Sequence, residues 1–358
     1  MIKYIIRRLI QAVPTFFGIT VISYLLVFLS PGSVIDRLLF GPNTRPEQRE
    51  LLAAQLGISD PFPVQYLRWL LGDDWMRWDS DGDGISDQAV IIPLDVDGDG
   101  EPEPPGRGRG ILRGDFGQSF LKRQPASTII TERMPATLEL GVTALVLSLC
   151  VGLPVGVISA VQRGKLVDNL SRVMAVMFNA VPAFWLGLIL ILIFGSTLGW
   201  LPMGSRCKPS LTGVCPPLPE RLEFLIMPAF VLATTNIAIF SRFMRTSMLE
   251  VMGQDFVRTA QSTGLAPRAV YVRHAMRNAL IPIATLIGPI ITGLWAGAVV
   301  IEQIFSWPGV GQAAVKAIID KDYPVIMAAV IFTSVGTIIG FLISDILYAV
   351  IDPRIRLQ

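Results

Sequence analysis

The stretch "LELGVTALVLSLCVGLPVGVISAV" (residues 138–161) contains one charged residue, Glu139, and that residue lies at its second position. A helix needs about 20 mostly apolar residues to cross a hydrocarbon core of about 30 Å, and this stretch is long enough. It therefore predicts a helix that spans a membrane.

The rest of the chain has the same character. Of its 358 residues 52% are hydrophobic and 16% are charged, and the mean hydropathy is +0.56, which excludes an ordinary soluble domain. Pro182 predicts a kink in the third apolar stretch, and Pro228 makes the limits of the fourth uncertain. We expect an all-α membrane protein with six transmembrane helices, at approximately Leu9–Leu29, Leu138–Val161, Val173–Leu198, Leu225–Phe240, Ala279–Ile301 and Ile326–Ile351.

Charge predicts the orientation, because loops rich in lysine and arginine stay in the cytoplasm. Lys3, Arg7 and Arg8 precede the first span without any acid, and "QRGK" (162–165) is basic. Residues 241–282 hold six arginines against two acids, whereas residues 31–133 hold 17 acids against 11 basic residues. Both termini are therefore expected in the cytoplasm and residues 31–133 outside it, in a multi-pass protein of a bacterial or archaeal cytoplasmic membrane.

These patterns give a domain organisation. Residues 1–30 form an N-terminal transmembrane helix, and residues 31–134 form an extracytoplasmic region with an acidic insertion at about 73–113. Residues 135–358 form a core of five transmembrane helices, with a cytoplasmic loop at about 241–280.

The insertion carries two runs in which acids alternate with small residues, "DSDGDGISD" (79–87) and "DVDGDGEPE" (95–103). They resemble the start of the D-x-D-x-D-G calcium loops of thrombospondin type 3 repeats and dockerins, in which alternation points several oxygens at the ion. The twelfth position, where a bidentate acid is expected, is Val90 in one run and Gly106 in the other. Either weak calcium sites or a solvated acidic segment fits this pattern. The candidate ligands are Asp79, Asp81, Asp83, Ile85 (carbonyl), Asp87, Asp95, Asp97, Asp99, Glu101 (carbonyl) and Glu103.

Signs of catalysis are absent from the sequence. It has no phosphate-binding G-x-x-x-x-G-K-[ST] loop, and its one histidine, His274, lies outside the predicted spans. Cys150 is expected to pack inside a span. Cys207 and Cys215 either close a small extracytoplasmic disulfide or remain free thiols. We expect the chain not to be an enzyme.

Three acids lie near the ends of predicted spans, at Glu139, Glu302 and Asp345. Because a charge is costly at the centre of a bilayer, placement at the membrane interface is the simpler interpretation. Three pairs of glycines lie four residues apart and are expected to mark close helix packing, at Gly152/Gly156, Gly293/Gly297 and Gly336/Gly340.

The basic loop contains "QDFVRTAQSTGLAPRAVYVRHAMRNALIP" (254–282). Asp255 to Ser262 is expected to form a polar helix with Val257 and Ala260 on one side. Gly264 should end that helix, and Pro267 should start a second short helix that runs to Met276. A basic helix–glycine–helix unit suits docking to another protein, although topology alone also makes such loops basic.

This stretch closely resembles the EAA-type coupling loop of ABC importer permeases of the dipeptide/oligopeptide/nickel branch, with Thr259–Ala260 at the alanine pair. The glutamate and first alanine of the general pattern are absent. The likeness extends over nearly the whole chain except about Asp73 to Arg113, which makes the acidic runs an insertion. Further segments that carry it are "YIIRRLIQAVPTFFGITVISYLL" (4–26), "LGISDPFPVQYLRWL" (56–70), "GDFGQSF" (114–120), "ERMPATLELG" (132–141), "VPAFWLGLILILIF…LGWLP" (181–202) and "VVIEQIFSWPGVGQAAVKAIIDKDYPVIMA…DILYAVIDPRIR" (299–356).

The resemblance implies a type I ABC importer permease bundle with an extracytoplasmic loop domain between helices 1 and 2. It implies a second homologous permease, two cytoplasmic ATPases that bind ATP and magnesium, and an extracytoplasmic solute-binding protein as partners, with no nucleic acid. The chain would form half of the pathway for peptides, or for a related solute such as nickel, and would need no cofactor for transport. It also implies the residues that meet an ATPase: Asp255, Arg258, Thr259, Ala260, Gly264, Pro267 and Arg268.

Two other classes of membrane protein are alternatives. An ion-coupled transporter or channel predicts paired charges in mid-membrane and inverted repeats, and a membrane-embedded hydrolase predicts a histidine-based site. The sequence has none of these features. It does not distinguish the transported solute or the residues that line the pathway.

Overall fold

The computed structural model describes residues 2–30, 61–72, 77–78, 88–89, 109–208 and 215–351. The chain forms two compact units. One comprises Met1–Ala12, Arg133–Gln312 and Thr333–Gln358, and the other comprises Val13–Glu132 and Ala313–Phe332.

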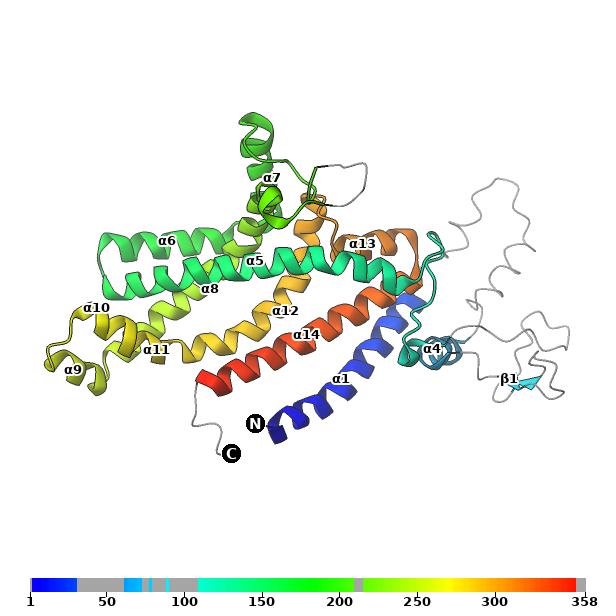
Figure 1. The fold of residues 1–358 in the computed structure, drawn as a ribbon, viewed down its shortest axis with the longest axis horizontal. Helices are drawn as coiled ribbons and strands as arrows, with labels where there is room; N and C mark the ends of the chain where they lie inside the picture. The colour runs from blue at the N-terminus through cyan, green and yellow to red at the C-terminus, as the bar shows by residue number, and fades with distance from the viewer. Residues whose placement is uncertain are drawn as a thin grey trace. The chain divides into compact units, whose positions relative to one another are not determined.

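Helices make up almost all of the described chain (Figure 1). Two of the short elements, η1 and η3, are 3₁₀ turns, and η2 and η4 are π-helical. In chain order the elements are α1 (Ile2–Phe28), α4 (Phe62–Leu71), η1 (Ile111–Arg113), α5 (Ala126–Val161), α6 (Leu166–Ala180), α7 (Ala183–Leu190), η2 (Ile191–Thr197), η3 (Leu218–Arg221), α8 (Leu222–Met252), α9 (Asp255–Ser262), α10 (Pro267–Ala269), η4 (Val270–Ala275), α11 (Met276–Ala279), α12 (Ile281–Ile304), α13 (Val310–Asp320) and α14 (Tyr323–Ile351).

The expected all-α class has one small exception among the described residues. Strands β1 (Arg77–Trp78) and β2 (Gln88–Ala89) pair antiparallel within the acidic insertion, with Arg77 opposite Ala89 and Trp78 opposite Gln88. Aromatic residues favour strands, but a run this short is invisible to a search for apolar stretches of membrane length.

Membrane-spanning helices are present in the expected order. Four described helices are long and apolar enough to cross a bilayer without a break: α1, α5, α8 and α14. Two further spans are bent pairs, α6 with α7–η2 at 99° and α10–α11 with α12 at 53°. Counting each bent pair as one span gives the six that the sequence predicts.

The bend between α6 and α7 lies where Pro182 predicts a kink, but it breaks the helix. Val181 and Pro182 have extended backbone angles, and α7 starts immediately after the proline. A proline removes one backbone donor and obstructs the preceding turn, so the helix ends before it and a new one begins after it.

Two helices extend beyond the predicted spans. α5 begins at Ala126 rather than near Leu138 and so crosses the domain limit expected at 134/135. α8 continues to Met252, so the expected loop from residue 241 begins as helix. Apolar length detects only the part of a helix that lies in lipid. Met244, Met248 and Val251 continue the buried face of α8 past that point.

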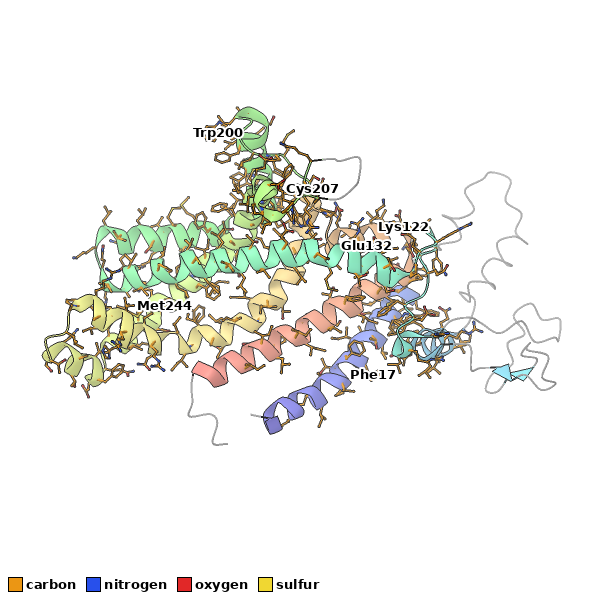
Figure 2. The ribbon with its side chains drawn as sticks, viewed as in Figure 1. Phe17, Lys122, Glu132, Trp200, Cys207 and Met244 are labelled. Carbon is orange, nitrogen blue, oxygen red and sulfur yellow. A yellow bond between two sulfur atoms is a disulfide. The ribbon has the colours of Figure 1, made fainter. Side chains whose placement is uncertain are left out.

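The centre of the first unit is α8, which packs against α6, α7, α11 and α12. Its buried side chains include Phe240, Met244 and Met248, all at 0% exposure, and Figure 2 labels Met244. α5 adds a hydrogen bond from the Ser148 hydroxyl to the Ala233 carbonyl of α8.

Close packing of α5 on α8 depends on Gly152 and Gly156. A methyl group at Gly152 would lie 2.9 Å from Cβ of Phe240, and one at Gly156 would lie 2.6 Å from Cβ of Met244 and 2.7 Å from the carbonyl oxygen of Ser241. Small residues four apart let two helix backbones approach closely. The predicted packing role of this glycine pair is confirmed.

Gly156→Ala should therefore destabilise the protein by about 1–3 kcal/mol, because overpacking a close contact forces the helices apart. Thermal unfolding of the purified chain in detergent, followed by tryptophan fluorescence, measures the effect. The expectation of close packing at Gly293 is wrong for this chain, because a methyl group there meets nothing within 4 Å, and Gly293→Ala is therefore the matched control. Equal unfolding temperatures for the two variants would contradict the close approach.

Candidate functional site

The segment from α9 to α11 (Asp255–Ala279) follows α8 directly and forms the predicted helix–glycine–helix unit. Helix α9 begins at Asp255. The negative carboxylate of Asp255 in the first turn interacts favourably with the positive end of the helix dipole. Val257 and Ala260 lie on its buried side, at 0% and 8% exposure. Because α9 packs against α8 and η4, it is held by its own chain.

Gly264 makes the turn between the two helical parts. Its φ angle is +78°, in the left-handed region that L-residues with side chains rarely adopt. A Cβ atom there would meet nothing within 4 Å. The turn therefore requires the backbone freedom of glycine and not its small size.

The second part begins at Pro267, whose fixed φ angle suits the first turn of a helix. It runs through the π-helical turn η4 into α11 and ends at Ala279, one turn beyond the expected Met276. Val270, Ala275 and Ala279 are fully buried and belong to the same core as Met244 and Met248 of α8. The α9–α11 segment is thus anchored to α8 through both of its parts.

Six of the seven residues predicted to meet an ATPase are exposed: Asp255, Arg258, Thr259, Gly264, Pro267 and Arg268. The prediction for Ala260 needs correction. Its side chain is buried in the core of this chain, so it positions α9 and offers no surface to a partner. Motif matching treats the residues of a helix alike, whereas folding buries one side of it.

Three exposed apolar side chains of the same segment were missed by the sequence analysis. They are Phe256, Leu265 and Val272, at 40%, 43% and 47% exposure. The sequence did contain a sign of this surface, because apolar residues are unusual on a short polar helix and beside the glycine that ends it. Buried apolar side chains contribute most of the affinity of interfaces, and arginines are enriched in them. This surface of apolar residues among arginines is suited to a protein partner.

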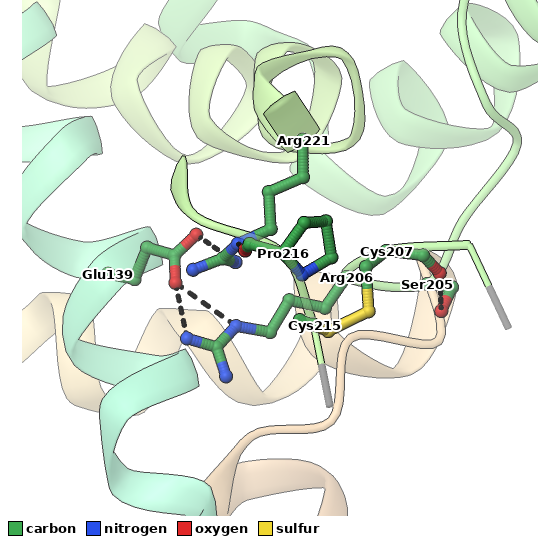
Figure 3. The surroundings of a disulfide bond; sticks show 7 residues. All are labelled: Glu139, Ser205, Arg206, Cys207, Cys215, Pro216 and Arg221. Carbon is green, nitrogen blue, oxygen red and sulfur yellow. Dashed lines mark hydrogen bonds and ion pairs between the residues drawn. A yellow bond between two sulfur atoms is a disulfide. The ribbon is translucent and has the colours of Figure 1, made fainter. Parts of the chain in front are cut away.

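Glu139 is not a free intramembrane charge. One carboxylate oxygen accepts from Nε and Nη2 of Arg206 at 3.0 and 2.5 Å, and the other accepts from Nη1 of Arg221 at 2.6 Å (Figure 3). Arg221 also donates to the Pro216 carbonyl at 2.8 Å. The carboxylate and the two arginines thus form a cluster in which each charge has a partner.

The two arginines flank a disulfide: Arg206 directly precedes Cys207, and Arg221 ends η3, six residues after Cys215. Cys207 and Cys215 are bonded, with their Cα atoms 5.7 Å apart, which decides between the two states that the sequence left open. The bond lies next to Arg206 and Pro216, and so it helps hold the loop against Glu139 (Figure 3).

Glu302 also has a structural role. Its side chain is fully buried and accepts hydrogen bonds from the Thr137 hydroxyl at 2.7 Å and from the backbone N–H of Gln312 at 2.8 Å. The Thr137 hydroxyl oxygen in turn accepts from the backbone N–H of Val310 at 2.8 Å. These contacts satisfy free donors at the first turn of α13. The side chain of Asp345 lies outside the described part of the chain.

The candidate calcium ligands between Asp79 and Asp87 and between Asp95 and Glu103 also lie outside the described residues. Within the residues that are described, no group of three or more histidine, cysteine, aspartate or glutamate side chains could hold a metal ion.

Known proteins are similar to this chain over most of its length. The family model of the binding-protein-dependent transport system inner membrane component matches residues 152–357, and the model of its N-terminal part matches residues 1–77. The oligopeptide transport system permease protein AppB of Bacillus subtilis is 35% identical over 99% of this chain and 100% of its own length. The dipeptide transport system permease protein DppB of Escherichia coli is 32% identical over 99% of both chains. Among solved structures, the inward-facing MetNI methionine ABC transporter matches 61% of this chain and 96% of its own, at 16% identity and a TM-score of 0.46.

Proposed function

The chain belongs to the family of binding-protein-dependent transport system inner membrane components, and we propose that it forms half of the translocation pathway of an ATP-driven peptide importer. As a member of this family it is a multi-pass permease subunit of an importer in the inner membrane. The proposal adds the solute, the partners and the surface through which the chain responds to ATP.

The observation that carries the proposal is the construction of the α9–α11 segment. One side of it is buried against α8, and the other exposes Phe256, Leu265 and several arginines. A partner that binds the exposed side therefore moves α8 with it. ATP-driven closure of two ATPases could in this way swing the helices between inward- and outward-facing states.

Peptides are proposed as the solute because the two relatives described above are permeases for oligopeptides and for dipeptides, and each matches over nearly its full length. The proposed partners are a second homologous permease, two cytoplasmic ATPases and an extracytoplasmic solute-binding protein. The proposed orientation has both termini and the α9–α11 segment in the cytoplasm, and it is supported by their basic residues. ATP hydrolysis belongs to the partners, and this chain supplies no catalytic group.

Reconstitution tests the proposal directly. The chain is expected to import a labelled dipeptide or oligopeptide into liposomes only when the second permease, both ATPases, the binding protein and ATP are all present. The chain without the ATPases should hydrolyse no ATP. A complete complex that hydrolyses ATP but imports no peptide, or ATP hydrolysis by the chain alone, would contradict the proposal.

Gly264→Val should uncouple ATP hydrolysis from import. Valine at a φ angle of +78° is strained by at least about 1–2 kcal/mol, so the turn distorts and the two helical parts no longer move together. The measurement is the number of ATP molecules hydrolysed per peptide imported, at matched amounts of complex. Gly264→Asn is the control, because asparagine tolerates left-handed angles and should preserve the ratio. Normal import by the valine variant would refute the role given to the turn.

We further propose that the acidic insertion binds calcium weakly. Asp79, Asp81, Asp83 and Asp87 with the Ile85 carbonyl would surround one ion, and Asp95, Asp97, Asp99 and Glu103 with the Glu101 carbonyl a second. The support is the alternation of oxygen ligands and the glycines at the sixth positions. The ions would affect delivery of the solute outside the membrane and not the ATPase cycle.

Calorimetry on the full chain in detergent tests this proposal. Calcium should bind with a dissociation constant of about 0.1–1 mM, the range of extracellular modules, and magnesium should bind far less. The double variant Asp81→Asn with Asp97→Asn should lose most of the binding heat, whereas Asp60→Asn, outside both runs, should retain it. Absence of calcium-specific heat would leave a solvated acidic insertion.

A further inference from the structure

The carboxylate of Asp168, in the first turn of α6, accepts four hydrogen bonds. It is 1% exposed. Arg245 of α8 holds it as a fork, with Nε 2.7 Å from Oδ1 and Nη2 2.9 Å from Oδ2. Ser159 of α5 donates its hydroxyl to Oδ1 at 2.6 Å, and the backbone N–H of Gly164 donates to Oδ2 at 2.9 Å.

These four hydrogen bonds join three helices at one point. Ser159 belongs to the last turn of α5, Gly164 to the tight turn that follows, and Asp168 to the start of α6, which runs back in the opposite direction (Figure 1). Arg245 is 77 residues further along the chain and belongs to α8. The ion pair therefore ties the α5–α6 hairpin to α8.

Close packing of α5 on α8 occurs at the same turn of α8 that carries Arg245. A methyl group at Gly156 would lie 3.1 Å from the backbone nitrogen of Arg245 itself. Bidentate arginine–carboxylate pairs fix direction as well as distance. The Asp168–Arg245 pair therefore fixes the rotation of α8 about its axis, and the contact at Gly156 fixes the separation of α8 from α5.

Arg245 also lies close to the α9–α11 segment. It precedes the end of α8 at Met252 by seven residues, or about 10 Å of helix. Between them, Met248 and Val251 are buried in the core that also holds Val257 of α9 and Val270 of η4. Packed side chains thus connect the α9–α11 segment to the part of α8 that carries Arg245.

We propose that Asp168 and Arg245 are positioning residues for transport, which make the α5–α6 hairpin move with α8 when the α9–α11 segment is displaced. α6 leads into the 99° bend before α7, so the ion pair links the ATP-driven movement to the broken span. The inference rests on the proposed function, because it assumes that an ATPase moves the segment. Neither residue contacts the exposed surface of Phe256 and Leu265, so their role is transmission and not docking.

Arg245→Ala and Arg245→Lys test the inference in the reconstituted complex. Without the fork, ATPases should still bind and hydrolyse ATP, but the hairpin should no longer follow α8. ATP hydrolysed per peptide imported should rise at least about fivefold in Arg245→Ala, the lower end of the range for coupled sites. It should rise less in Arg245→Lys, since lysine keeps the charge but not the two-pronged geometry.

Arg242→Ala is the matched control, because Arg242 is an exposed arginine of the same helix that does not contact Asp168. It should leave the ratio unchanged. A merely structural role would lower the amount of complex, and with it import and ATP hydrolysis in proportion, so the ratio would stay constant. If Arg245→Ala does not assemble, a raised ratio in Arg245→Lys supports the inference and an unchanged ratio overturns it.

The wild-type complex distinguishes failure of this inference from failure of the proposed function. If it imports peptide and both Arg245 variants keep its ratio, the inference alone is overturned. If the wild type shows no uptake that depends on the binding protein and ATP, the proposed function fails and the inference fails with it.

Discussion

Helices α5 and α8 pack so closely at Gly152 and Gly156 that a Cβ atom at either position would clash with α8, and α8 in turn carries the α9–α11 segment. Helices in lipid are not driven together by the hydrophobic effect, so close van der Waals packing and polar contacts must hold them. The glycines supply the packing. The Asp168–Arg245 ion pair and the Ser148–Ala233 hydrogen bond supply the polar contacts on the same two helices or their immediate neighbour.

The buried charges of the first unit follow one rule. Asp168 and Glu302 lie near the ends of α6 and α12, Glu139 lies within α5, and each carboxylate accepts hydrogen bonds from several donors. A buried charge without a partner would be strongly destabilising. Each carboxylate lies beside arginines or free backbone N–H groups, so each charge connects neighbouring elements of the chain.

The α9–α11 segment shows how a surface for a partner is built from a short stretch. Its apolar residues divide into a buried set, with Val257 and Val270, and an exposed set, with Phe256 and Leu265. The buried set gives the segment a fixed position on α8, and the exposed set gives a partner something apolar to bind among arginines. Because the anchor and the surface alternate along the same helices, displacement of one displaces the other.

The sequence by itself determined the class of the protein, the six spans in order, a bend at Pro182, the turn at Gly264 and the family, because apolar length, proline, glycine and motifs act locally along the chain. It could not give the ends of α5 and α8, which extend beyond the apolar runs. Nor could it show that Ala260 faces inward, that Cys207 bonds Cys215, or that Arg245 pairs with Asp168. Those features depend on which surfaces meet after folding, and residues 77 positions apart carry no local sign of their contact. Tertiary structure alone decided which charges pair between elements and which side of α9 stays exposed for a partner.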